Sequence, residues 1–309
     1  MCRQQYNDNE IRRFVNFITD NFKQREIVEI RAIGVSEVLE DNNIIKYDEP
    51  VNYAGYFKNI DELIKELHKI SVATSIYFQL NRTNISNFDR SPNKMSKSIK
   101  CASEEFVDNR EIILIDLDPE RDFKGPSTKE KHKQSYDVAR NIAKYLHDEG
   151  FKEPIICSSG NGTHLYYKVN INKDKENTTL IKNFLKTINR WNDHRDIKVD
   201  CGVFDVARIC KLPGTVNCKT DYKDIDENGK LNKRQLEHRM AKVLYYPEQF
   251  ENTDIETIKT ITVGSQDEET EEYNVGEDNI ESQELRTHEM IAWLEEEGHG
   301  YIKVVNKEK

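Results

Sequence analysis

Two aspartates, Asp116 and Asp118, stand one residue apart directly after the apolar run IILI at positions 112–115. Alternate side chains of a β-strand point to the same face, so both carboxylates are expected on one face and Leu117 on the other. Two carboxylates this close repel each other unless a cation, a proton or a basic side chain lies between them. The pair therefore indicates a divalent-metal site, and a strand that ends in a polar turn at Pro119 is the structural alternative.

A second group of residues that could do chemistry lies in PIICSSGNGTHLYYKV, positions 154–169. Gly160 and Gly162 allow positive φ and a close approach of the backbone, which a turn that cradles a phosphate requires. Alternation along the following strand places His164 on one face with Tyr166 and Lys168. His164 could donate to a phosphate oxygen, with help from Ser159 and backbone N–H groups. The alternative is a plain β-hairpin with a glycine-rich turn.

A third group lies in VDCGVFDVARICKLPGTVNCKT, positions 199–220. Asp200 follows the strand-like run IKV and could supply a third carboxylate, and Asp205 is the competing candidate. Arg208, Lys211 and Lys219 add three cations within the same stretch. A surface ion pair between Asp205 and Arg208 is the structural alternative.

These groups need a framework of helices and strands to bring them together. Apolar spacing predicts helices over 10–22, 128–150 and 178–191, and a short helix capped by Asp61. Strands are predicted at 26–33, at 75–80 and around the three motifs. Because helices and strands mix without a strict βαβ repeat, the expected fold class is α+β.

Charge divides the chain into a body and a tail. The net charge of the whole chain is −10, yet residues 251–300 carry 16 Asp/Glu against 2 Lys/Arg, so the first 250 residues are mildly basic. A basic body can offer a positive face to a polyanion. We predict a catalytic domain over 1–250, an acidic flexible linker over 251–284 and a short helical segment over 285–309.

Composition limits the compartment and the cofactors. No apolar run approaches the roughly 18 residues of a membrane span, and residues 1–9 are too polar for a signal peptide, so a cytoplasmic protein without a membrane partner is expected. The scattered cysteines suit free thiols in a reducing compartment. Cys201, Cys210 and Cys218 lack the CxxC-like spacing typical of a zinc site.

The three motifs, in this order and spacing, resemble the archaeo-eukaryotic primase (AEP) superfamily, in particular the primase-polymerases of plasmids and phages. The resemblance covers about residues 26–250. It rests on GYF at 55–57, ILIDLDPER followed by GPSTKEK, SSGNGTHLYYKV, VDCGVFDVARICKLPGTVNCK and the closing EHRMAKVLYYPE.

The resemblance implies a catalytic fold in which an RRM-like antiparallel sheet packs with an N-terminal αβ module. It also implies that the chain is a nucleotidyltransferase, a DNA primase and polymerase for the replication of a mobile element. Two Mg²⁺ or Mn²⁺ ions would be held by Asp116, Asp118 and Asp200. The implied partners are a single-stranded DNA template, dNTPs or NTPs, and a helicase in trans or in a missing C-terminal part.

The family's nucleotide-binding motif falls on Ser159, Gly160, Gly162 and His164, with His164 at the triphosphate. Arg208 matches a recurrent arginine, while Lys211 stands where many relatives have arginine and would act as a point charge. Lys219 joins this set, and Arg31 is a further candidate, with a surface salt bridge as its alternative.

Two other functions are possible on the sequence alone. A metal-dependent nucleotide-sugar transferase would explain the two aspartates but not the later motifs. A non-catalytic replication-initiation or DNA-binding module of the same fold would differ from a polymerase by the absence of metal-dependent nucleotide incorporation.

Overall fold

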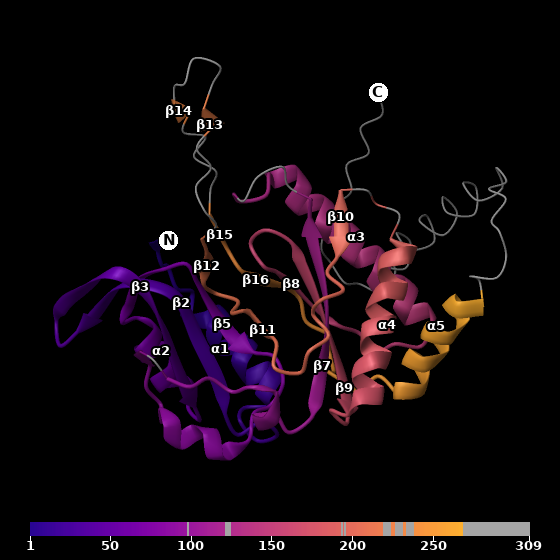
Figure 1. Cartoon of the computed structure of the whole chain (residues 1–309), viewed down its shortest axis with the longest axis horizontal. Helices are drawn as coiled ribbons and strands as arrows, with labels where there is room; N and C mark the ends of the chain where they lie inside the picture. The colour runs from indigo at the N-terminus through magenta and orange to yellow at the C-terminus, as the bar shows by residue number, and fades with distance from the viewer. Residues whose placement is uncertain are drawn as a thin grey trace. The chain divides into compact units, whose positions relative to one another are not determined.

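The computed structural model resolves most of the chain into one unit, Met1–Val263, and a second unit covers Gly264–Lys309. The described residues are 1–97, 99–120, 125–192, 194, 196–218, 224–225, 231–232 and 238–267. The first unit contains two antiparallel sheets with helices between and beside them (Figure 1). This mixture of helices and antiparallel sheets confirms the expected α+β class at that level.

The first sheet has seven strands, in the order β1-β4-β2-β3-β6, with β5 pairing to β2 and β11 pairing to β5. Its strands are β1 (Cys2–Arg3), β2 (Val28–Glu40), β3 (Asn43–Phe57), β4 (Ile70–Ala73), β5 (Ser75–Gln79), β6 (Ser96–Lys97) and β11 (Ile209–Lys211). The helix α2 (Ile60–Leu67) and the 3-10 turns η1 (Ile85–Arg90) and η2 (Glu104–Phe106) lie in its connections. The sheet thus takes one strand, β11, from the late segment that carries Arg208 and Lys211.

The second sheet has five strands in the order β10-β7-β9-β8-β16, and every neighbouring pair is antiparallel. Its strands are β7 (Arg110–Pro119), β8 (Ile155–Ser158), β9 (Thr163–Ile171), β10 (Ile197–Val199) and β16 (Lys242–Tyr245). The helices α3 (Lys129–Asp148) and α4 (Lys175–Trp191) connect these strands as β7-α3-β8-β9-α4-β10. This is the β-α-β-β-α-β connectivity of split βαβ folds.

Three aromatic rings join the two sheets across the helix α1 (Asp8–Thr19). The ring of Phe14 lies 5.0 Å from Phe78 of β5 and 6.3 Å from Tyr166 of β9. All three side chains are fully buried. Burial of large aromatic rings contributes much of the packing energy, so this cluster fixes the two sheets against each other.

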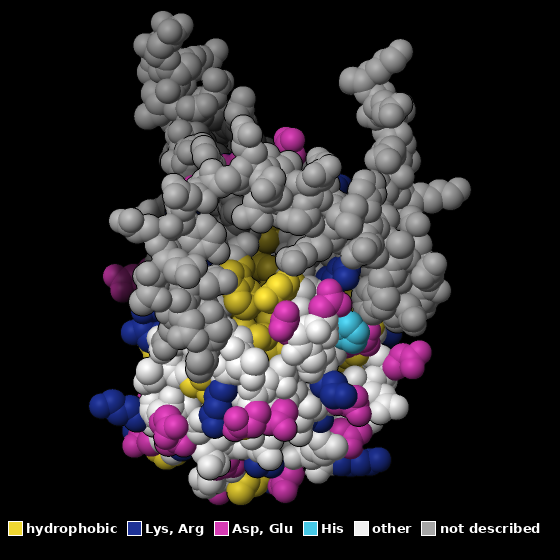
Figure 2. Space-filling model, turned by 90° about the vertical axis from the view of Figure 1, so that its right-hand side faces the viewer, with side chains coloured by type: hydrophobic (Ala, Val, Ile, Leu, Met, Phe, Trp, Pro, Cys, Tyr) yellow, Lys and Arg dark blue, Asp and Glu magenta, His cyan; other side chains and the backbone are white. Residues whose placement is uncertain are grey.

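The opposite face of the second sheet is covered by helices. Tyr167, the neighbour of Tyr166, points the other way and meets Phe151, which stacks on Phe184 of α4 at 5.4 Å. The helix α5 (Ile255–Asp267) adds the buried side chains of Ile258 and Ile261 to the core. Figure 2 shows the side of the molecule that lies on the right in Figure 1, with hydrophobic side chains gathered in its middle.

The sequence predicted most of these elements near their observed positions. The cap of α2 is a difference, because Asn59 rather than Asp61 accepts the first N–H groups of that helix. The helix α5 lies within the range predicted as an acidic linker, so the ordered unit continues beyond residue 250. Residues 268–284 of that predicted linker and the predicted segment 285–309 lie outside the described residues.

Cys2 and Cys218 form a disulfide with a Cα–Cα distance of 5.8 Å, which corrects the expectation that all six cysteines are free. The two residues are 216 positions apart, so only the fold brings them together. None of the helices in the described part of the chain is long and apolar enough to cross a membrane. The remaining short strands form two pairs: β12 (Val216–Asn217) with β15 (Arg239–Met240), and β13 (Asp224–Ile225) with β14 (Leu231–Asn232).

Candidate active site

The three predicted carboxylates line one pocket at the end of β7. Asp116 and Asp118 are half-buried on one face of the strand, while Leu117 between them is fully buried. Asp200 follows β10, which pairs with β7, and its backbone N–H donates to the carbonyl of Asp116 at 2.8 Å. Asp116, Asp118 and Asp200 all contribute to the lining of this pocket.

Asp205, the competing candidate for the third carboxylate, lies elsewhere. Its Oδ2 forms an ion pair of 2.6 Å with Arg208, and the residue is not part of the pocket lining. The surface ion pair that the sequence left open is therefore present. Asp200 is the third acid that the fold brings to Asp116 and Asp118.

The three carboxylates are suitable ligands for a divalent cation, but their side chains are not arranged as a complete metal site. Oxygen ligands are those that Mg²⁺ and Mn²⁺ prefer. Among the described residues, however, no group of three or more His, Cys, Asp or Glu is placed so that it could hold a metal ion. One Oδ of Asp200 accepts the N–H of Gly202 at 2.7 Å, which orients that carboxylate within its own turn.

The glycine-rich turn between β8 and β9 lies against the end of β7. A Cβ on Gly162 would collide with the carbonyl of Leu117 and lie 2.9 Å from an Oδ of Asp118. Gly160 has φ of +86°, a conformation that L side chains rarely adopt. The predicted need for both glycines is thus explained by two causes, close approach at 162 and backbone conformation at 160.

The N–H groups of this turn are directed inward. The N–H of Gly160 donates to Ser158 Oγ at 3.0 Å, and those of Asn161 and Gly162 donate to Ser159 Oγ at 3.4 and 3.0 Å. The expected phosphate cradle of backbone donors is not open in this conformation. The role of Ser159 at a nucleotide stays a prediction, since its hydroxyl already holds the turn.

His164 lies directly opposite Asp116 in the β7–β9 pairing and is 6% exposed. Its Nε2 is 3.3 Å from Asp116 Oδ1, and its Nδ1 is 2.8 Å from the hydroxyl of Tyr166. Contacts on both ring nitrogens fix the orientation of the imidazole. His164 therefore lies beside the carboxylates in the lining of the pocket.

Lys211 reaches the pocket from the first sheet. Its Nζ donates to the hydroxyl of Tyr77 at 2.6 Å and lies 3.8 Å from the centre of that ring. Arg208 also lines the pocket, and one of its amino groups donates to the carbonyl of Gly202 at 2.6 Å. Lys219 lies outside the described residues.

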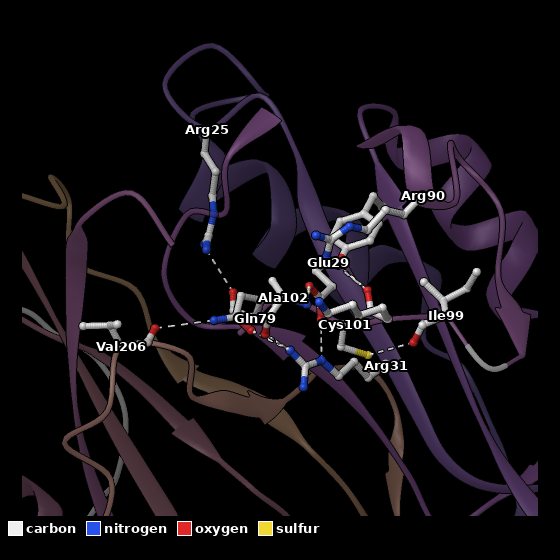
Figure 3. A network of polar contacts seen from close by, with 11 residues as sticks. Arg25, Glu29, Arg31, Gln79, Arg90, Ile99, Cys101, Ala102 and Val206 are labelled. Atoms are coloured by element: carbon white, nitrogen blue, oxygen red, sulfur yellow. Dashed lines mark hydrogen bonds and ion pairs between the residues drawn. The ribbon is translucent and has the colours of Figure 1, made fainter. Parts of the chain in front are cut away.

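Arg31 does not line the pocket. Its guanidinium pairs with Glu29, whose side chain is buried, and donates to Gln79 Oε1 at 3.2 Å and to the carbonyl of Ala102 at 2.9 Å (Figure 3). The salt bridge that the sequence left open is therefore present, although it is partly buried rather than on the surface. A role for Arg31 at the site stays a prediction, since Arg31 pairs across the strands with Tyr77, which lines the pocket. Arg31 belongs to a partly buried network inside the first sheet.

Sequence reasoning missed the residues that hold the turn in place. The N–H of Ser127 donates to Asn161 Oδ1 at 3.0 Å, and Arg239 donates to the carbonyls of Gly160 and Ser127 at 3.2 and 2.7 Å. Asn217 donates to the carbonyl of Ser159 at 2.7 Å and lines the pocket. Asn161 stood inside the quoted motif, whereas no local pattern marks Arg239 or Asn217.

Two buried groups at the pocket stay neutral. Burial, followed by the charge of Asp116, raises the pKa of the Cys210 thiol, and burial raises the pKa of the Tyr166 hydroxyl. A protonated thiol is a poor metal ligand and a poor nucleophile. The negative charge of the pocket therefore comes from its three carboxylates.

Comparison with known proteins adds little to this geometry. No protein family matches the chain, and no curated protein does. Among solved structures, the chain is similar to the polymerase domain of Mycobacterium tuberculosis Ligase D in complex with DNA, with a TM-score of 0.36 and 13% identity. The match covers 67% of this chain and 74% of that chain. A likeness at this level is weak, and the argument for function rests on the pocket.

Proposed function

We propose that the chain is a divalent-metal-dependent nucleotidyltransferase, a DNA primase and polymerase of the AEP type. The observation that carries the proposal is the convergence of Asp116, Asp118 and Asp200 with His164 and a lysine in one pocket. These residues come from two sheets and lie up to 95 positions apart (116 to 211). In this proposal the β-α-β-β-α-β sheet is the RRM-like module and the first sheet belongs to the N-terminal module.

The proposed reaction joins a nucleotide to a 3′-hydroxyl. The hydroxyl oxygen attacks the α-phosphorus, the bond to pyrophosphate breaks, and the hydroxyl proton leaves to solvent. Two divalent ions, when bound, would lower the pKa of the attacking hydroxyl and stabilise the departing pyrophosphate. Asp116, Asp118 and Asp200 would hold them after small rotations of their side chains, since all three already line the pocket.

The basic residues would bind the phosphates of the incoming nucleotide. Lys211 neutralises charge on the triphosphate as a point charge, and its contact with Tyr77 sets its position. His164 would donate from Nε2 to a phosphate oxygen if the carboxylate of Asp116 were held by a bound metal ion instead. Arg208 reaches the same group if it leaves Asp205. Positioning and charge neutralisation are most of what a protein contributes to phosphoryl transfer.

Template-directed extension on single-stranded DNA, with Mg²⁺ or Mn²⁺ and with dNTPs or NTPs supplied separately, tests the proposal. We expect incorporation by the unaltered chain and its loss in Asp116→Asn. Asp108→Asn is the matched control, because Asp108 is an exposed carboxylate that precedes the other end of β7. Products without a primer would establish initiation. DNA binding without incorporation under any condition would reject the polymerase in favour of a non-catalytic module.

A further inference from the structure

A second charged region lies away from the pocket, on the first sheet's connections. Residues 82–106 hold five Lys/Arg against three Asp/Glu, in a chain whose net charge is −10. Three cations and two aromatic rings meet there, and we call them the basic aromatic surface. Its members are Lys58, Phe88, Arg90, Lys100 and Phe106.

Aromatic rings hold these cations. Lys58 Nζ lies 4.2 Å from the centre of the Phe88 ring, and Arg90 Cζ lies 4.1 Å from the centre of the Phe106 ring. Lys100 Nζ lies 5.6 Å from the same Phe106 ring. The contact of a cation with a ring face limits where the cation can go without cancelling its charge.

Carboxylates, in contrast, do not neutralise them. Within the described residues, neither Lys58, Arg90 nor Lys100 forms an ion pair with Asp or Glu. Arg90 instead donates to the carbonyl of Lys100 at 3.2 Å. On α3, by contrast, the exposed Lys133 forms an ion pair with Asp137 at 2.7 Å.

The surface is open to a ligand. Lys58 and Lys100 are exposed, and the two rings are half-buried, so that part of each remains accessible. Lys97, also exposed, extends the surface along β3, with its Nζ 5.5 Å from the Tyr47 ring. Cations beside accessible rings are the elements that bind single-stranded nucleic acid, where phosphates contact lysines and bases stack on rings.

We propose that the basic aromatic surface binds single-stranded nucleic acid, and that it holds the template strand. The identity of that strand as a template rests on the proposed function, whereas the binding does not. An anionic membrane is a poorer fit, because Ile85 is the large exposed hydrophobic residue among the described residues of this segment, and a single such residue does not make an apolar face.

The test is the affinity of the full chain for a fluorescent oligothymidylate of about 20 nucleotides, measured by anisotropy over a salt series. The variant is Lys58→Ala with Lys100→Ala. The control is Lys175→Ala with Lys186→Ala, which removes the same charge from exposed positions on α4. Each lost phosphate contact on a single strand lowers the salt slope by about 0.7, or about 5-fold in affinity at ~0.1 M salt. We therefore expect about 25-fold weaker binding by the variant and little change in the control.

Equal losses in the two double variants would reject the surface, because they would reflect only overall charge. Unchanged binding of DNA by the surface variant would also reject the proposal. So would a variant that binds DNA normally but binds anionic vesicles or acidic peptides more weakly. Incorporation on saturating primed template separates this proposal from the proposed function. The surface variant should need more template but reach the same rate. Binding that depends on Lys58 and Lys100 in a chain that never incorporates nucleotides would uphold the surface and reject the polymerase.

Discussion

The candidate pocket and the basic aromatic surface both gather cations, but they balance them differently. In the pocket region, Arg208 forms an ion pair with Asp205 at 2.6 Å, and Lys211 lies over the Tyr77 ring in a pocket lined by three carboxylates. On the basic aromatic surface, Lys58 and Arg90 lie over phenylalanine rings, and no described carboxylate forms an ion pair with either of them. Paired charges fix directions for a small substrate, while unpaired charges keep their attraction for a long anion. If both proposals hold, chemistry and strand binding are separate tasks in this chain.

Asp118→Asn should have the largest effect and should change the pocket without changing the basic aromatic surface. Loss of one ligand carboxylate is expected to lower the rate of incorporation by roughly 10³-fold, since charge stabilisation at the reacting phosphate is lost. Affinity for single-stranded DNA should stay the same, because the basic aromatic surface is untouched. Single-turnover incorporation measures the rate, and fluorescence anisotropy measures the affinity for single-stranded DNA. A parallel fall in both would show that the two regions are not separate.

Gly162→Ala should have the second-largest effect on the rate of incorporation. The added methyl group meets the carbonyl of Leu117 and an Oδ of Asp118, so the turn must move away from β7. A displacement of about 1 Å in a catalytic group costs roughly 10²-fold in rate. Overpacking should also lower stability by about 1–3 kcal/mol. Full activity with an unchanged melting temperature would mean that the turn is not constrained by β7.

Phe106→Leu tests the contribution of the basic aromatic surface to binding of single-stranded DNA. Leucine keeps an apolar side chain but removes the ring that contacts Arg90 and Lys100. Stacking of one base on a ring is worth about 1–3 kcal/mol, so single-strand affinity should fall at least about 5-fold. Phe250→Leu is the control, because Phe250 also lies beside a cation, Lys168, at 5.7 Å. Similar losses in both variants would remove the special role of Phe106.

The smallest expected effect concerns pH. Burial, then the charges of Arg239 and Lys242, lowers the pKa of His132 to about 4 from its ordinary 6.5. Between these two values the unfolded chain binds more protons at this group, so the folded state should lose stability as pH falls from 6.5 towards 4. His132→Gln should flatten this fall in melting temperature, because it keeps an acceptor for Ser158 Oγ, 2.7 Å from Nε2, without titrating. An unchanged pH profile would contradict the linkage.

Local patterns predicted the parts of the site that a short stretch of chain determines. Alternation placed Asp116 and Asp118 on one face, and the glycines marked a real turn beside them. The helix α3 begins after Thr128, whose hydroxyl caps it, and ends before Gly150 at φ of +92°. In each case the deciding interactions lie within a few residues, so periodicity and capping rules were sufficient.

Other features depend on residues that are distant in sequence. The long β2–β3 hairpin was not predicted beyond residue 33. The first part of β3 is largely exposed, and register shifts on both sides of Val35 interrupt the alternation of β2, although Val35 and Val38 are buried. The contact of Lys211 with Tyr77 spans 134 positions, and the disulfide spans 216. Only tertiary packing brings such pairs together, and no local pattern carries that information.

The segment from β10 to β11 crosses from one sheet to the other within a few residues. Asp200 follows β10, an edge strand of the second sheet, and Lys211 belongs to β11, which pairs with β5 in the first sheet. The lining of the candidate pocket therefore cannot form from either sheet alone. We expect that separately expressed halves are inert, and that activity during refolding recovers only when the two sheets have docked, later than the secondary structure.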